Sequence, residues 1–214
     1  MYKAVVKTGL QEKAVIGGLS FFECNKVLWY EDMKDFTRSD LLFSLCGLNC
    51  GLCSMHLGGH CPGYGGGEGN QPCKIARCSK QHGEPEYCSL CRQFPCENYE
   101  KIDEYDSFIS HLHQKRDLHK RDEIGTEAYR REQTEKRKML EWLLLNYNDG
   151  RKKTFFSLAV NLMELQDIKE VKQQIGKDKE IEDLTIKEKA ARVKRLLEDK
   201  ARERQVTLQL RKKK

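Results

Sequence analysis

The clearest hydrophobic pattern lies in the second half of the chain, where apolar residues recur at helical spacing. Leu140, Leu143, Leu144 and Tyr147 occupy positions i, i+3, i+4 and i+7. Such a stripe covers one face of a helix and lets that face pack against a neighbour. The run Asn148-Asp149-Gly150 follows at once and is typical of a helix end. The pattern therefore predicts a packed helix that stops at this run.

Two further apolar stripes predict more helices. The first stripe consists of Phe155, Leu158, Ala159, Leu162 and Leu165. The second consists of Ile186, Ala190, Val193 and Leu197. Thr185 and Glu188 match a capping box at the start of the second stripe, because side chains three residues apart can satisfy free N–H groups there. We expect all of these apolar residues to have packing roles.

The two ends of the chain lack this helical pattern. Residues 206–211 read Val-Thr-Leu-Gln-Leu-Arg and alternate with period two, which predicts one short strand. Residues 1–36 contain strand-like pieces at residues 4–6 and 27–30. Met33 offers a second start, so Cys24 would be incidental if the upstream residues are not native. We therefore treat residues 1–36 as an N-terminal extension of uncertain structure.

Composition separates a loop-rich segment from the helical one. Residues 37–96 hold all four prolines, ten of the sixteen glycines and nine of the ten cysteines. Ordering such loops costs much conformational entropy, and cross-linking by a metal ion can offset it. We predict a mainly α fold with minor short strands: a small, loop-dominated, cysteine-rich metal-binding module at residues 37–96, and an α-helical body with a basic tail at residues 97–214.

Charge and hydropathy exclude several classes of protein. The formal net charge is +6, and most of the excess would vanish without residues 211–214, so we expect no nucleic-acid partner. Mean hydropathy is −0.74, and no apolar run reaches the roughly 18 residues of a membrane span. The apolar stretch at residues 14–22 lacks a signal-peptide cleavage site. We therefore expect a cytoplasmic protein with reduced thiols and no membrane partner.

The spacing of the cysteines indicates what chemistry the chain can perform. The nine cysteines of the module are Cys46, Cys50, Cys53, Cys61, Cys73, Cys78, Cys88, Cys91 and Cys96. Two C-x-x-C pairs stand among them, and a tight turn in such a pair places two thiolates on one tetrahedral ion. Two pairs flanked by further cysteines and by Gly and Pro turns indicate metal binding more strongly than a disulfide framework.

Nine thiols suffice for two four-coordinate ions and leave one over. Proximity along the chain groups the four cysteines of residues 46–61 in one set and the five of residues 73–96 in another. A cross-braced arrangement, in which both C-x-x-C pairs share one ion, fits the spacing equally well. His56, His60 and His82 are candidates to replace a sulfur. We predict all nine cysteines as metal ligands.

Two zinc ions are the first expectation, and an iron–sulfur cluster is the alternative. Cys46-x3-Cys50-x2-Cys53 has the spacing of radical enzymes that use S-adenosylmethionine, but the βα units of such enzymes do not follow it. The spacings also differ from the C-x2-C-x2-C-x3-C-P run of bacterial ferredoxins. Thiolates suit both metals, so ligand type alone does not separate them.

These motifs resemble a known family. The segments Cys46-Gly-Leu-Asn-Cys-Gly-Leu-Cys53, Cys73-x4-Cys78 and Cys88-x2-Cys91-x4-Cys96 look like the hallmark of a cysteine-rich prokaryotic domain-of-unknown-function family, DUF 3795. The likeness continues through residues 142–165 and 208–213 and so covers nearly everything after Met33. It implies zinc and helices and no assigned activity. One departure is Tyr64, which stands where members commonly have a cysteine.

The sequence favours a zinc-stabilised binding or regulatory module over an enzyme. All-thiolate sites are typical of structural zinc, and no H-E-x-x-H motif provides an open catalytic site. His111-x-His113 would point to two faces of a helix, so we interpret it as a solvated segment. An iron–sulfur or thiol-based redox protein is the alternative, since the ninth thiol could be reactive. A protein partner, unidentified by the sequence, fits the first hypothesis.

Overall fold

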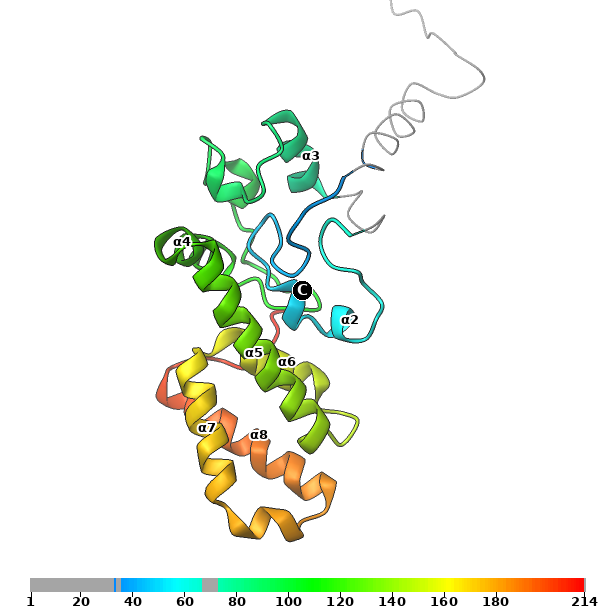
Figure 1. Ribbon diagram of the computed structural model, residues 1–214, viewed down its shortest axis with the longest axis vertical. Coiled ribbons are helices and arrows are strands. Elements are labelled where there is room, and N and C mark those ends of the chain that lie inside the picture. The colour runs from blue at the N-terminus through cyan, green and yellow to red at the C-terminus, as the bar shows by residue number, and fades with distance from the viewer. Residues whose placement is uncertain (1–32, 34–35, 67–72, 214) are drawn as a thin grey trace, which may run out of the picture.

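The computed structural model describes residue 33 and residues 36–66 and 73–213 (Figure 1). The strand-like pieces expected at residues 4–6 and 27–30 lie outside these residues, as does Cys24. The described residues form seven α-helices: α2 (Ser54–Leu57), α3 (Lys74–Gln81), α4 (Gln114–Ile124), α5 (Thr126–Tyr147), α6 (Lys153–Leu162), α7 (Leu165–Lys177) and α8 (Ile186–Glu203). Short 3-10 turns are η1 (Cys50–Leu52), η3 (Cys88–Leu90), η4 (Glu97–Tyr99) and η5 (Lys179–Asp183). The predicted mainly α fold is confirmed.

Helix α6 is the centre of the helical body. Seven consecutive residues, from Phe156 to Leu162, are buried. A helix that is buried on every side packs against neighbours all round, and α6 contacts α2, η1, α5 and α8. Figure 1 shows α7 and α8 side by side at one end of the molecule, with α3 at the other end.

The ends of the helices follow the sequence signals with one exception. Helix α5 ends at Tyr147, and Thr185 begins α8 with a complete capping box, so both expectations are confirmed. The stripe expected from Phe155 to Leu165 belongs to two helices, because Met163 and Glu164 adopt extended backbone and Leu165 begins α7. The one-helix interpretation of that stripe is therefore wrong.

Two hydrophobic clusters organise the interior. The larger is formed mainly by α5 to α8, and Leu52 of η1 joins it. The smaller contains Phe43, whose ring centroid lies 4.7 Å from that of Tyr129 on α5. Each cluster therefore mixes side chains from both sides of the predicted boundary at residue 96, and the cysteine-rich segment packs directly on the helices.

The C-terminal segment is not a strand, and the described residues contain none. The burial of residues 206–210 alternates, and Val206 and Leu208 pack against the larger cluster. A strand also needs a neighbour with which to form a ladder of hydrogen bonds. At its end this segment instead bonds to Asp106: Asp106 N–H donates to Arg211 O at 2.8 Å, and Arg211 N–H donates to Asp106 Oδ2 at 2.8 Å.

Asp106 anchors the C-terminal segment, and its removal has a predictable effect. Burial opposes its ionisation, but hydrogen bonds from Arg211 and His111 lower its pKa to about 2, from 3.8. A lowered pKa means that its stabilisation is present above pH 3.8 and is lost as pH falls towards 2. We expect Asp106→Asn to lower the free energy of unfolding by about 2 kcal/mol at neutral pH.

Urea unfolding of the wild type and Asp106→Asn between pH 7 and pH 2 measures this difference. The difference in the free energy of unfolding between the two proteins should disappear towards pH 2. A gap that stays constant with pH would show that the ionised carboxylate is not what holds the segment.

No helix in the described part of the chain is both long enough and apolar enough to cross a membrane.

Candidate metal centre

The two C-x-x-C pairs fold into the same turn at two distant places in the chain. In each pair the N–H of the second cysteine donates to the carbonyl of the first, at 3.0 Å for Cys53 and Cys50 and at 2.9 Å for Cys91 and Cys88. The second cysteines share one conformation, with φ and ψ of −74° and 135° for Cys53 and −78° and 136° for Cys91. Such a turn can present both thiols to one ion.

The first thiol set, which we define as Cys46, Cys50, Cys53 and Cys61, gathers around Cys50. Burial raises the pKa of the Cys50 thiol well above its usual range. The other three members of the set lie close enough to raise that pKa further through like-charge repulsion. Cys46 is the most enclosed, and its sulfur lies 3.2 Å from Ser44 Oγ and accepts from Gln114 Nε2 at 3.2 Å.

The second thiol set, which we define as Cys78, Cys88, Cys91 and Cys96, lines one cavity of about 20 Å³. Burial raises the pKa of Cys88 to about 12, and the thiols of Cys46, Cys96 and Cys78 contribute to the increase. Burial and the thiols of Cys96 and Cys91 likewise raise the pKa of Cys78. All four thiols of this set therefore line the same cavity.

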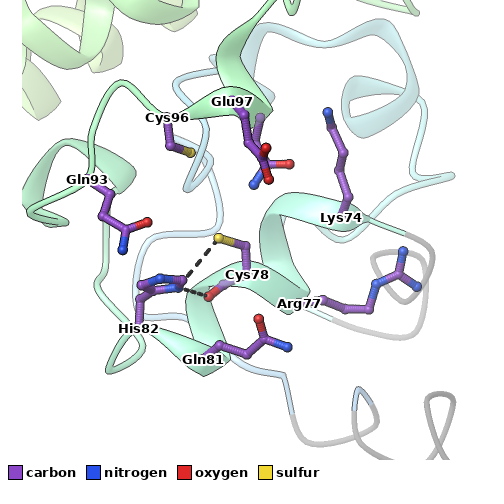
Figure 2. A pocket seen from close by; sticks show the side chains of 9 residues that line it. Lys74, Arg77, Cys78, Gln81, His82, Gln93, Cys96 and Glu97 are labelled. Atoms are coloured by element: carbon purple, nitrogen blue, oxygen red, sulfur yellow. Dashed lines mark hydrogen bonds between the residues drawn. The ribbon is translucent and has the colours of Figure 1, made fainter.

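The second set opens on one side to the surface. Figure 2 shows the sulfur atoms of Cys78 and Cys96 pointing into the same space, with the ring of His82 beside Cys78. His82 Nδ1 lies 2.8 Å from the carbonyl of Cys78 and 3.6 Å from its sulfur. This space is a cleft of about 700 Å³, and it gives an ion a route from solvent to the thiols.

Cys73 lies apart from the second set. It is absent from the cavity of that set, and its sulfur lies 3.1 Å from the hydroxyl of Tyr64. Cys73 also lies close enough to Cys46 to raise the pKa of that buried thiol. The structure thus places Tyr64 against Cys73 and near Cys46 of the first set. Cys73 belongs to neither thiol set as we define them.

The histidines have separate surroundings. His56 Nδ1 lies 2.9 Å from the carbonyl of Cys61, which ties His56 to the first thiol set, whereas His60 is exposed. His111 and His113 precede α4, so the interpretation that places them on a helix is wrong. His113 is half-buried and not solvated, and burial lowers its pKa to about 4.

A buried polar network was not visible in the sequence. Asn49, inside the first cysteine motif, donates to Asp117 Oδ2 at 2.8 Å and accepts from Tyr129 Oη at 3.0 Å. Lys136 is 2% exposed and faces Asp117. The only sign of this network in the sequence is the position of Asn49 between two cysteines. Its partners on α4 and α5 are distant in the chain and are brought to it by the fold.

The cysteines have the chemistry of metal ligands, but their side chains are not arranged as a metal site. All nine described cysteines are free thiols. Among the described residues, no three His, Cys, Asp or Glu side chains already form a group that could hold a metal ion. The prediction of nine metal ligands therefore stays a prediction, and the side chains of each set would have to close on an ion.

Comparisons with protein-family models, curated proteins and solved structures found no match for this chain.

Proposed function

We propose that this chain is a zinc-binding protein, in which two thiolate sites fix a loop module that serves as a binding or regulatory surface. The observation that carries the proposal is the convergence of Cys78, Cys88, Cys91 and Cys96 on one small cavity. Membership in DUF 3795 is part of the same proposal.

Electrostatics supports a cation among these thiols. Without one, burial and mutual repulsion keep the pKa of Cys50 and Cys88 high, so these thiols stay protonated at neutral pH. A bound dication reverses this balance and deprotonates its ligands outright. Zinc would supply binding energy that the loops lack, on the order of 10–16 kcal/mol for a structural thiolate site.

The size of the cavity favours zinc over an iron–sulfur cluster. A cavity of about 20 Å³ holds little more than one water-sized sphere. One tetrahedral ion with sulfur ligands at about 2.3 Å suits this space. A cluster of several iron and sulfide atoms needs more room between its cysteines.

Metal analysis of protein purified reduced and without chelator tests the proposal. We expect about two zinc ions per chain in the wild type, because eight thiols form two sets of four. Cys91→Ser should remove one ion, since it breaks the second set. Cys73→Ser is the matched control, and it should keep the ion of the second set because Cys73 lies outside that cavity.

Three results would contradict the proposal. Protein without metal would refute metal binding altogether. Iron with visible absorption would favour the redox alternative, because zinc thiolates are colourless. Loss of an ion from Cys73→Ser together with retention in Cys91→Ser would show that the thiols are grouped differently.

A further inference from the structure

A second cleft of about 700 Å³ lies between the first cysteine motif and α5, away from the second thiol set. Its volume falls within the range of about 300–1,000 Å³ that is typical of small-molecule sites. One wall is apolar and includes Leu41, Leu42 and Pro62. The facing wall comes from one side of α5, where Arg130, Gln133 and Arg137 follow one another at helical spacing.

The charge of this cleft is positive. Asp40 is the single acid among the described residues that line it. The Asp40 carboxylate already accepts from Tyr87 Oη at 2.8 Å and from Arg130 Nε at 3.0 Å. Arg130 pairs with Asp40 and also with Glu127 outside the cleft, and Arg137 is the second arginine among the lining residues.

Arg137 is able to turn towards a ligand. Its Nε donates to Glu141, one helical turn away, at 3.0 Å, and both side chains are more than one-third exposed. Exposed pairs at this spacing contribute little to stability. A ligand with an anionic oxygen group inside the cleft can compete for the guanidinium, because charge-assisted bidentate bonds to arginine are stronger than this surface pair.

Gln133 adds a hydrogen-bonding requirement. Its Oε1 is buried and has no hydrogen-bond partner within the described structure. A buried acceptor without a partner is unfavourable, so a ligand that places a donor at this position would gain affinity. Tyr129 also lines the cleft, but its hydroxyl already donates to Asn49 and does not serve Gln133.

We propose that this cleft binds a small organic acid with a ring-sized apolar body, an anionic carboxylate group for Arg137 and a hydroxyl donor for Gln133. The apolar wall would cover the ring. None of the described lining residues is a cysteine, but Gly51, Leu52 and Pro62 adjoin cysteines of the first thiol set, so the test uses the metal-loaded chain.

Amide chemical shifts of the full chain, titrated with three aromatic probes, test the proposal. The probes are 4-hydroxybenzoate, benzoate and phenol, which separate the contributions of the carboxylate and the hydroxyl. We expect 4-hydroxybenzoate to bind most tightly and phenol at least about tenfold more weakly. The shifts should centre on lining residues such as Gly51 and Thr134.

Arg137→Gln should weaken the binding of 4-hydroxybenzoate by about tenfold or more and leave that of phenol unchanged. Arg131→Gln is the matched control, since Arg131 is exposed on the same helix outside the cleft. Glutamine is a good helix former, so both variants should keep α5 folded. The metal content of each variant, measured in the same samples, separates this test from that of the zinc sites.

Equal binding of phenol and 4-hydroxybenzoate would overturn the proposal, as would an absence of shifts at millimolar probe. Equal losses in Arg137→Gln and Arg131→Gln would also overturn it, because the effect would then come from net charge alone.

Discussion

Chelation of the bound zinc under reducing conditions is expected to unfold the cysteine-rich segment while α5 to α8 keep their structure. Most of the larger hydrophobic cluster comes from α5 to α8, where Leu140, Phe156 and Val193 are fully buried. The cysteine-rich segment has short helices and many loops, so metal binding would supply most of its stability. Far-UV circular dichroism should therefore change little.

Hydrogen exchange, followed residue by residue, measures this selective loss. Amides of η1, α3 and η3 should lose protection, and those of α6 and α8 should keep it. Re-addition of zinc should restore the pattern, and magnesium should not, because thiolates are poor ligands for magnesium. Unchanged protection of η3 after removal of all metal would contradict a stabilising role for the ion.

Asp117→Ala is expected to lower the free energy of unfolding by about 3–5 kcal/mol. Asp117 is 4% exposed, and it lies at the meeting point of the first cysteine motif, α4 and α5. Burial raises its pKa, and burial lowers the pKa of Lys136, which faces it. Truncation would leave Lys136 buried without the carboxylate that favours its charge most, and Asn49 with only its longer bond, 3.5 Å, to Asn161 Oδ1.

Denaturation in urea, at constant metal content, measures the effect. Asp117→Asn keeps the shape of the side chain and removes its charge. It should therefore lower the free energy of unfolding by less than Asp117→Ala does. Glu123→Ala is the control on the same helix, because Glu123 is exposed and surface changes of this kind stay within about 0.5 kcal/mol. A loss below 1 kcal/mol for Asp117→Ala would show that Lys136 is stabilised by other acids, such as Glu164.

The elements that the sequence predicted well are those with local causes. The end of α5 at Tyr147 follows from its stop signal, and the start of α8 follows from the capping box at Thr185 and Glu188. The break between α6 and α7 has no Gly or Pro to mark it, so periodicity alone joined the two helices. The alternation in residues 206–210 is real in its burial, but a strand depends on a partner that no local pattern reveals.

The same distinction applies to the candidate site. The spacing of each C-x-x-C pair dictates its turn, and both turns are present. The contact of Tyr64 with Cys73 depends on how distant loops meet, as does the network around Asn49. Sequence proximity placed Cys73 with the later cysteines, whereas the structure separates it from their cavity.

The docking of η1 on α6 has a consequence for the synthesis of the chain. Ser157 on α6 donates to the carbonyl of Leu52, 105 residues earlier. Ribosomes release the chain from its N-terminus, so the first thiol set emerges long before the helix that covers it. The second thiol set lies wholly between residues 78 and 96 and can assemble as soon as that stretch leaves the exit tunnel. In the nascent chain, the first thiol set is therefore exposed to oxidants for longer than the second thiol set.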